Sequence, residues 1–583
     1  MTLLEDIYLP YKRKKKTRAS VAKEKGLEPL AILIFMQNDT DNPFKIAAEY
    51  LNENVATQED ALQGARDIIA EWMSEDEQIR TKIRYYFEKE GLITSKVVRN
   101  KDEEGFLRVS IVPREPEYMM AQLEKSVIKG NGDASNQVKL ALEDSYDRLL
   151  SSSIETEFRN ASKERADVEA IKVFAENARQ LLLAAPLGQK RILAIDPGFR
   201  SGCKIVCLDE TGTLLYNTNI YPHPPQNQER EALTKLDELI DKYKLEAIAV
   251  GNGTAGRESV TMLKGLRNFK NVVIFSVNEA GASIYSASEA AREEFPDHDV
   301  TVRGSVSIGR RLADPLAELV KIDPKSIGVG QYQHDVNQSL LKQSLDRTVE
   351  SAVNSVGINV NTASKHLLAY VSGLGPVLAQ NIVTYRTENG LFKSRSEIKK
   401  VARMGEKAFE QCAGFLRVRD AKNPLDNTAV HPEAYSTVEA IAKDMSCKVS
   451  DLIENSAKRK EIDLKKYVSD KIGLPTLQDI ILELAKPGLD PRGEAKAFEF
   501  GNVHSLEDLF EGMILPGIVT NITNFGAFVD IGVKQDGLVH ISQLANKFVK
   551  NPNDIVKLND HVTVKITEVD VARKRVFLTM KGV

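Results

Sequence analysis

Three carboxylates stand where a phosphodiester-cleaving site could be built. Asp196 ends a short apolar strand, Glu279 comes just after a later strand, and Asp314 opens a helix further along the chain. Acids brought together at adjacent strand and helix ends could hold two divalent cations, Mg²⁺ or Mn²⁺, which would activate a water molecule and stabilise the leaving oxygen. A metal-dependent nuclease or resolvase is therefore one function that these residues allow.

Each acid also has a structural interpretation. Asp196 begins an Asp-Pro-Gly turn, and Asp314 precedes Pro315 as a helix N-cap would, a role that occupies its carboxylate. Arg310 and Arg311 come shortly before it and could neutralise a cation site. We therefore expect a domain that uses its fold for contact or scaffolding, without nuclease activity and without a cofactor, and the nuclease stays open as the alternative.

The C-terminal stretch from Gly512 offers a different chemistry, the stacking of nucleic-acid bases. Its short alternating segments, separated by Gly and Asn turns, predict the strands of a small barrel. Within 526–531 a period of two places the small and branched side chains in the core and Phe528 outside, with Phe525 at the preceding turn. Outward aromatic rings form a platform for bases, although Phe528 could instead cover a neighbouring loop.

Charged residues in the same stretch favour such a platform. Nine Lys and Arg against six Asp and Glu give it a net charge of +3, within a chain whose net charge is −4. His540 faces the opposite way from its neighbour in an alternating segment. We expect Phe525, Phe528 and His540 to stack on bases, and Lys565 and Arg575 to contact phosphates.

A turn with two glycines, Gly373-Leu374-Gly375, predicts a second site. One helix should end there and another begin with Pro376 in its first turn. Glycine amides and a new helix N-terminus form a seat for phosphate, and residues 363–422 carry eleven Lys and Arg against five acids. We expect Gly373 and Gly375 to hold nucleic-acid backbone, with a weaker second copy from Met404. An ordinary helical hairpin with a glycine cap is the alternative.

The elements that would position these residues follow from hydrophobic periodicity. Residues 1–188 are predicted to be helical, apart from an alternating segment between 96 and 117, and residues 325–505 to be helical again. Between them, three strands are followed by alternating helices and strands, which indicates a mixed α/β sheet with ligands at its strand ends. The expected strands of this sheet lie at 192–195, 204–208, 214–218, 247–250 and 272–277.

Composition excludes several classes of protein. The chain has 583 residues, of which 42% are hydrophobic and 28% charged, typical of a globular chain of about four domains. Its four cysteines have no zinc-ligand spacing and are too few for a disulfide scaffold. No apolar run of about 18 residues and no signal sequence is present. We therefore expect a cytoplasmic monomer that does not associate with membranes.

Three segments resemble known nucleic-acid-binding families. Residues 512–583 resemble the RNA-binding OB fold of ribosomal protein S-one repeats, in which the positions of Phe525, Phe528 and His540 line the nucleic-acid face. Residues 189–320 resemble an RNase H-like domain of the YqgF kind, related to RuvC resolvases. The glycine turn resembles a helix-hairpin-helix, which grips backbone phosphate without reading sequence. The match to the S-one repeats runs through Gly517–Val519, Phe525–Val529, Gly537–Ser542 and Val576–Lys581.

The order of these pieces resembles the Tex family, bacterial transcription accessory proteins related to a eukaryotic elongation factor. The resemblance implies sequence-nonspecific binding of RNA or single-stranded DNA, a cytoplasmic role in transcription, partners in the transcription or translation machinery, and an RNase H-like domain with no established nuclease activity. Members begin with a further helix-turn-helix-like segment, which we expect to be absent or truncated here. Further motifs that carry the resemblance are Tyr8–Lys12, Asn278–Ser283, Gly328–Asp335 and Val356–Ser364.

We therefore predict a multidomain protein of α, α/β and β parts. It should combine a helical scaffold, an RNase H-like mixed sheet, helix-hairpin-helix repeats and a C-terminal OB-fold barrel. The expected domains are a helical N-terminal scaffold at 1–188, the YqgF or RNase H-like domain at 189–324, the helix-hairpin-helix domain at 325–425, a helical domain at 426–508 and the RNA-binding OB fold at 509–583.

Overall fold

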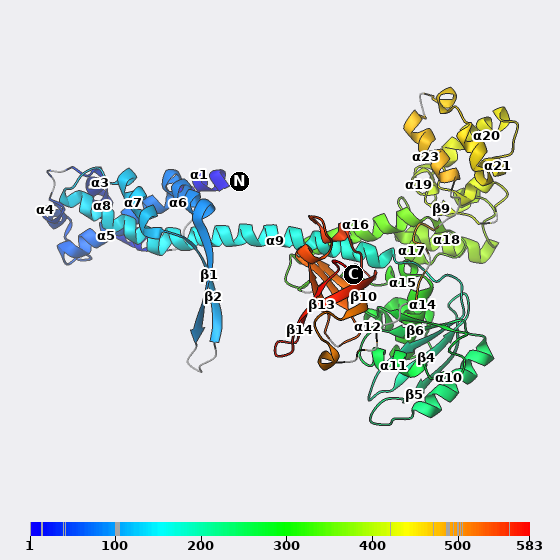
Figure 1. The fold of residues 1–583 in the computed structure, drawn as a ribbon. Coiled ribbons are helices and arrows are strands. Elements are labelled where there is room, and N and C mark those ends of the chain that lie inside the picture. The colour runs from blue at the N-terminus through cyan, green and yellow to red at the C-terminus, as the bar shows by residue number, and fades with distance from the viewer. Residues whose placement is uncertain are drawn as a thin grey trace. The chain divides into compact units, whose positions relative to one another are not determined.

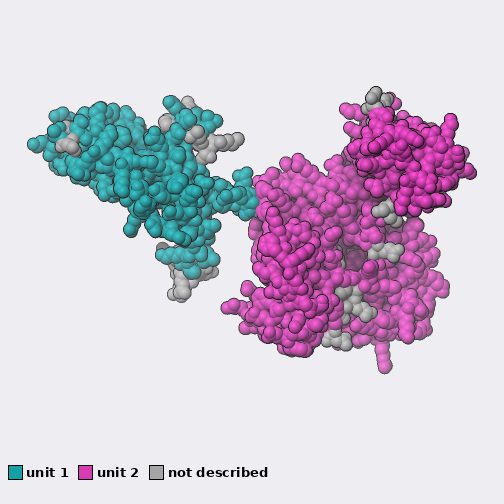
Figure 2. Space-filling view, turned by 45° about the horizontal axis from the view of Figure 1, so that its top comes forward, with its two compact units in different colours: residues 1–167 teal, residues 168–583 magenta. Residues whose placement is uncertain are grey.

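The structure is a computed structural model that describes residues 2–12, 16–38, 40, 42–99, 105–330, 332–419, 421–469, 472–485, 490–493, 495–497, 501, 503, 505–533, 535–558 and 560–583. The chain forms two compact units, residues 1–167 and 168–583, which Figure 2 shows in teal and magenta. Each unit has a hydrophobic core of its own.

The first unit is helical, with one two-stranded ribbon (Figure 1). Helix α5 (Gln58–Glu75) begins at a capping box formed by Thr57 and Asp60. It buries Ile68, Ile69 and Met73. The ribbon of β1 (Gly91–Arg99) and β2 (Gly105–Pro113) is antiparallel and begins earlier than the alternating segment predicted from the sequence. The helices are α1 (Thr2–Tyr8), α2 (Arg18–Glu24), α3 (Glu28–Met36), α4 (Pro43–Ala47), α5 (Gln58–Glu75), α6 (Glu77–Glu90), α7 (Pro116–Val127), α8 (Asp133–Asp144) and the first part of α9 (Ser151–Leu182).

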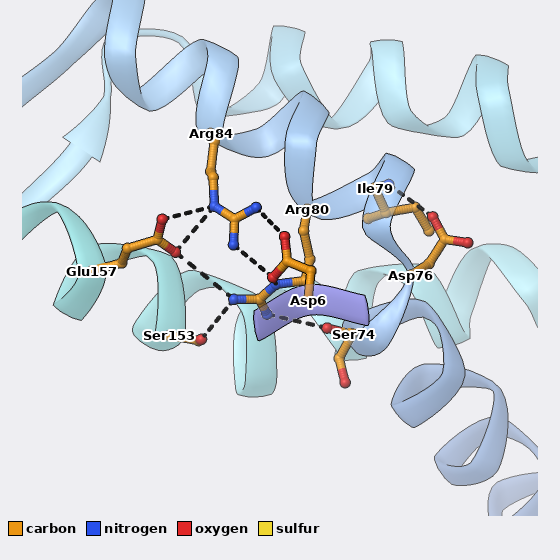
Figure 3. A network of polar contacts seen from close by, with 8 residues as sticks. All are labelled: Asp6, Ser74, Asp76, Ile79, Arg80, Arg84, Ser153 and Glu157. Carbon is orange, nitrogen blue, oxygen red and sulfur yellow. Dashed lines mark hydrogen bonds and ion pairs between the residues drawn. The ribbon is translucent and has the colours of Figure 1, made fainter. Parts of the chain in front are cut away.

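A buried ion network ties α1 to α6 and α9 (Figure 3). Asp6 is 2% exposed and accepts hydrogen bonds of 2.8 Å from Nε of Arg80 and from Nη2 of Arg84. Arg84 also donates from Nε to Glu157 at 2.8 Å. Burial alone would raise the pKa of Asp6, but the hydrogen bonds and charges of Arg84 and Arg80 lower it below its ordinary value of 3.8.

Asp6→Asn is expected to lower the unfolding free energy of the first unit by about 3 kcal/mol, because it leaves two buried guanidinium groups without this carboxylate. Since the pKa of Asp6 is lowered on folding, its contribution is present above pH 3.8 and is lost as the pH falls through the folded value. Urea unfolding of the parent and the variant should therefore differ near neutral pH and converge in acid. Glu117→Gln, at an exposed position of α7, is the control, and an equal loss in that variant would contradict the prediction.

The second unit opens with the predicted mixed sheet, whose strand order is β5-β4-β3-β6-β7. β3 (Ile192–Asp196), β4 (Cys203–Leu208) and β5 (Leu214–Ile220) pair antiparallel, while β6 (Ala247–Gly251) and β7 (Val273–Val277) run parallel to β3. Their bounds lie within two residues of the predicted strands. The helices of this part are α10 (Glu229–Tyr243), α11 (Gly256–Leu263), α12 (Ala282–Ala287), α13 (Glu289–Glu294), α14 (Val300–Ala313) and α15 (Pro315–Leu319).

Helical hairpins follow the sheet. A two-residue parallel pairing of β8 (Ile358–Asn359) with β9 (Leu416–Arg417) joins the two ends of the hairpin region. Arg395, 1% exposed, links this region to the next, since its guanidinium donates to four backbone oxygens and to the hydroxyl of Tyr435. The helices are α16 (Gln338–Val356), α17 (Lys365–Ala369), α18 (Gly375–Asn389), α19 (Glu406–Ala413), α20 (Tyr435–Asp444), α21 (Val449–Glu454), α22 (Ser456–Lys460) and α23 (Leu474–Leu484).

The C-terminal residues close into the predicted small barrel, which has five strands in the order β10-β11-β12-β14-β13. The burial of alternate residues in these strands reflects the period of two in the sequence. The strands are β10 (Ile514–Thr523), β11 (Gly526–Asp530), β12 (Gly537–His540), β13 (His561–Asp570) and β14 (Arg575–Thr579). The fold class predicted from the sequence is thus confirmed.

The barrel shares its core with the helices of the second unit. One continuous cluster of buried apolar residues runs from α9 and α16 to the inside of the barrel. Gln180 of α9 donates to Oδ1 of Asn553 at 2.9 Å and accepts from the backbone amide of Leu558 at 2.6 Å. Arg257 of α11 forms a 2.7 Å ion pair with Asp530. None of the helices in the described ranges is long and apolar enough to cross a membrane.

Candidate nucleic-acid interfaces

Three of the predicted stacking residues converge on the outside of the barrel. Phe525 is 50% exposed at the turn before β11, and its ring meets that of Phe528 edge to face, with centroids 6.1 Å apart. Gly526 pairs with His540 across β11 and β12, so that His540 lies diagonally beside Phe528. The exposed imidazole of His540 is held by a 2.9 Å contact between Nδ1 and Oγ of Ser542. The arrangement presents three rings to solvent from one end of two adjacent strands.

The two predicted phosphate contacts lie on neighbouring strands. Lys565 pairs with Thr579 and Arg575 with Asp570, and both basic side chains are exposed. The two rows are four positions apart along β14, about 13 Å. β12 runs parallel to β14 with Val539 opposite Leu578, so that His540 lies level with the row of Lys565, whereas Arg575 shares its row with an acid. The geometry favours Lys565 over Arg575 as a contact for a negatively charged backbone.

The two glycines of the helical hairpin have different surroundings. Both have a left-handed backbone, with φ of +84° at Gly373 and +64° at Gly375. A Cβ on Gly373 would lie 2.6 Å from Cβ of Gln411 in α19, whereas a Cβ on Gly375 would meet nothing within 4 Å. Gly373 thus allows the two hairpins to pack, and Gly375 stands at the open N-terminus of α18. Where the weaker second copy is predicted, Gly405 is the N-cap of α19 and is equally open.

Gly373→Ala is expected to destabilise the protein more than Gly375→Ala. Both changes force an L-residue into the left-handed region, at about 1 kcal/mol each, and only the first adds a steric clash with α19. Thermal unfolding of the two variants tests this difference. An equal loss of stability would mean that the packing of α18 against α19 does not depend on Gly373.

Of the three acids, Asp196 and Glu279 come together. Burial raises the pKa of both, and the charge of Asp196 raises that of Glu279 further. Lys204 offsets part of the shift at Asp196. The carboxylate of Glu279 lies so close to Gly253 that a Cβ there would stand 1.8 Å from Oε1, while Oε2 has no hydrogen-bond partner among the described residues.

Asp314 is engaged elsewhere, as its N-cap interpretation suggests. It accepts from the backbone amide of Ala317 at 3.2 Å, which caps α15. Arg492 also donates to both of its oxygens, at 2.7 and 3.2 Å, and at the same time binds Asp490. The side chain of Arg492 is only 4% exposed, so this is a fixed contact. The carboxylate predicted as a third metal ligand is therefore held by an arginine.

The described residues do not fit a two-metal site. No group of three His, Cys, Asp or Glu side chains within the described ranges is placed to hold a metal ion.

Sequence reasoning missed Arg492, which lies 178 residues from Asp314 and has no local signal. It also missed Phe548, which is 92% exposed between Lys547 and Lys550 on the barrel; the Lys-Phe-Val-Lys pattern could have drawn attention to it.

Five family descriptions match parts of this architecture. The hairpin region, predicted as a helix-hairpin-helix domain, matches such a description, and so does the region after it, which was predicted only as helical. The matches are "Tex central region-like" at 38–110, "Tex protein YqgF-like domain" at 190–313, "Helix-hairpin-helix motif" at 353–417, "HHH domain" at 423–492 and "S1 RNA binding domain" at 508–581.

Relatives match along nearly the whole chain. "Protein tex" of Bordetella pertussis is 46% identical over 628 residues, which cover 99% of this chain and 79% of that protein. "Transcriptional accessory protein Tex" of Neisseria gonorrhoeae is 46% identical, with 100% and 81% covered. The human "S1 RNA-binding domain-containing protein 1" is 30% identical, with 99% and 69% covered. At these identities and coverages, the chain belongs to the Tex family.

Proposed function

We propose that this protein binds single-stranded nucleic acid, RNA above all, without sequence preference, and that it acts as a transcription accessory factor. The observation that carries the proposal is the convergence of Phe525, Phe528 and His540 on one exposed face of the barrel. Base stacking on such rings is tolerant of sequence because every base has a π-face. The name of the Neisseria relative supports the role in transcription.

The helical hairpins supply a second contact in this proposal. The open N-termini of α18 and α19 present backbone amides, which favour phosphate and do not distinguish bases. Single-stranded DNA remains the alternative ligand, since the rings of the barrel face stack on either nucleic acid. Because Asp314 is bound by Arg492, cleavage of the bound strand is not part of the proposal.

A competition titration over a salt series tests the proposal. Fluorescently labelled single-stranded RNA, bound to the full chain, is displaced by unlabelled RNA, single-stranded DNA or duplex DNA. We expect single strands of unrelated sequence to compete equally and better than duplex, with an affinity that falls as salt rises, by about 0.7 logarithmic units per phosphate contact for each tenfold increase in salt. Preference for one RNA sequence, or an affinity independent of salt, would overturn it.

A further inference from the structure

A cavity of about 910 Å³ lies inside the second unit, and none of its lining residues belongs to β11 or β12. Its walls come from the end of α9, from β7, α14 and α15, from β10 and the start of β13, and from Pro491, Arg492, Ala495 and Lys496. Cavities of this size hold small ligands or single nucleotide units. The cavity is therefore separate from the stacking platform of the barrel.

The lining of this cavity carries an excess of positive charge. Its charged residues are Arg179, Arg311, Arg492, Lys496 and Lys557 against Glu176 and Asp560. Arg492 is neutralised by Asp314 and Asp490. None of the other four basic side chains forms an ion pair with a carboxylate among the described residues. Of these four, Arg311 is buried, Arg179 is half-buried, and Lys496 and Lys557 are exposed. A local excess of positive charge attracts anions.

Arg311 is the buried basic residue of the lining, and one of its donors is unsatisfied. It is 5% exposed, and its Nη1 donates to the backbone oxygens of Asn278 at 2.9 Å and of Ala280 at 2.7 Å. Its Nε has no hydrogen-bond partner among the described residues. Burial lowers the pKa of Arg311, and the charges of Glu318 and Glu279 oppose this without restoring the ordinary value. The unsatisfied N–H of Arg311 is a charged donor from which an anionic oxygen could accept a hydrogen bond.

Basic and apolar surfaces lie side by side in the cavity. Burial lowers the pKa of His561, the charge of Asp560 opposes this shift, and the charge of Lys496 adds to it, so that these three groups share one wall. Other walls are apolar, and the side chains that form them include Leu181, Phe275, Leu312 and Ile518. An inorganic anion would use only the first kind of surface. A phosphate ester that carries a base would use both.

We propose that this cavity binds a nucleotide unit, with its phosphate at the basic residues and its base against the apolar wall. The unit could be a free nucleotide or the phosphorylated end of a nucleic-acid strand, because the phosphate and the base are common to both. The site lies beyond the proposed function of the barrel face, since it uses none of Phe525, Phe528 and His540.

The test uses the full chain in which those three residues are all replaced by alanine, so that binding at the platform is removed. Calorimetric titrations are run with ATP, a 5′-phosphorylated RNA tetranucleotide, the same RNA with a 5′-hydroxyl, and pyrophosphate. We expect ATP or the phosphorylated RNA to bind, and Lys496→Glu with Lys557→Glu to weaken that binding at least tenfold. Lys465→Glu with Lys466→Glu, at two exposed positions outside the cavity, is the matched control and should leave binding unchanged.

Each outcome decides a part of the proposal. ATP binding identifies a free nucleotide as the source, and binding of only the phosphorylated RNA identifies a strand end. Pyrophosphate that binds as tightly as ATP would overturn the role of the apolar wall. No binding at millimolar concentration, or an equal effect of the control variant, would overturn the site. Such a failure leaves the function of the platform untouched, because the platform is already absent from the protein tested.

Discussion

Replacing Phe525 and Phe528 together by alanine is expected to weaken RNA binding at least 30-fold. The two rings meet edge to face and stand on the exposed end of β11, where each can stack on one base. Stacking contributes about 1–3 kcal/mol per base, so the loss of two rings amounts to about 2 kcal/mol or more. Fluorescence anisotropy with a labelled single-stranded RNA measures the change. The salt dependence should stay nearly constant, since no phosphate contact is removed.

Phe510→Ala is the matched control for this double variant. Phe510 is 63% exposed, like Phe525, but it precedes the barrel strands and takes no part in the platform. Because Phe528 is half-buried, Phe525→Ala alone provides a second test in which the barrel core is untouched. A circular dichroism spectrum equal to that of the parent shows that the barrel is folded. Unchanged RNA affinity in both folded variants would remove the platform from the proposed function.

Arg395→Met is expected to lower the unfolding free energy of the second unit by at least 3 kcal/mol. The guanidinium is 1% exposed and satisfies the backbone oxygens of Leu416, Asp426, Thr428 and Val430. Methionine fills part of the volume but leaves these buried acceptors without donors. Each unsatisfied acceptor then keeps its full desolvation penalty with no hydrogen bond to offset it. Tyr435 loses its donor as well.

Chemical denaturation followed by hydrogen exchange measures this effect. Exchange should accelerate most between residues 395 and 435, where the partners of Arg395 lie. Lys407→Met makes the same change of side chain at an exposed position of α19 and should alter stability by no more than about 0.5 kcal/mol. If both variants unfold at the same denaturant concentration, Arg395 does not join the two hairpin regions.

The barrel face was predictable because its signal is local. A period of two along 526–531 determines which side chains are inside, and the structure buries Ala527 and Val529 while Phe528 stays half-exposed. The mixed sheet was predictable for the same reason, from short apolar strands between turns. The role of Asp314 was half predictable, since the Asp-Pro pair indicates an N-cap and the structure has one.

Contacts between distant segments were not predictable from the sequence. Arg492 binds Asp314 across 178 residues, and Gln180 binds the amide of Leu558 across 378. Neither pairing leaves a periodic or compositional trace, because any exposed arginine or glutamine has the same local sequence signature. The basic cavity escaped notice for this reason too, since its lining is drawn from segments that are far apart in the chain.

The continuous core between the barrel and the helices has a consequence for how such a protein can change over generations. An S1 barrel is usually pictured as a cassette that can be gained, lost or exchanged. Here α9 contacts the barrel through Gln180 and shares its apolar core, so loss of residues 512–583 would expose apolar surface of the helical part. Proteases would degrade the misfolded chain, so that natural selection would act on the loss of folding before it acted on the loss of RNA binding. Exchange of the barrel therefore requires that the helices beneath it change at the same time.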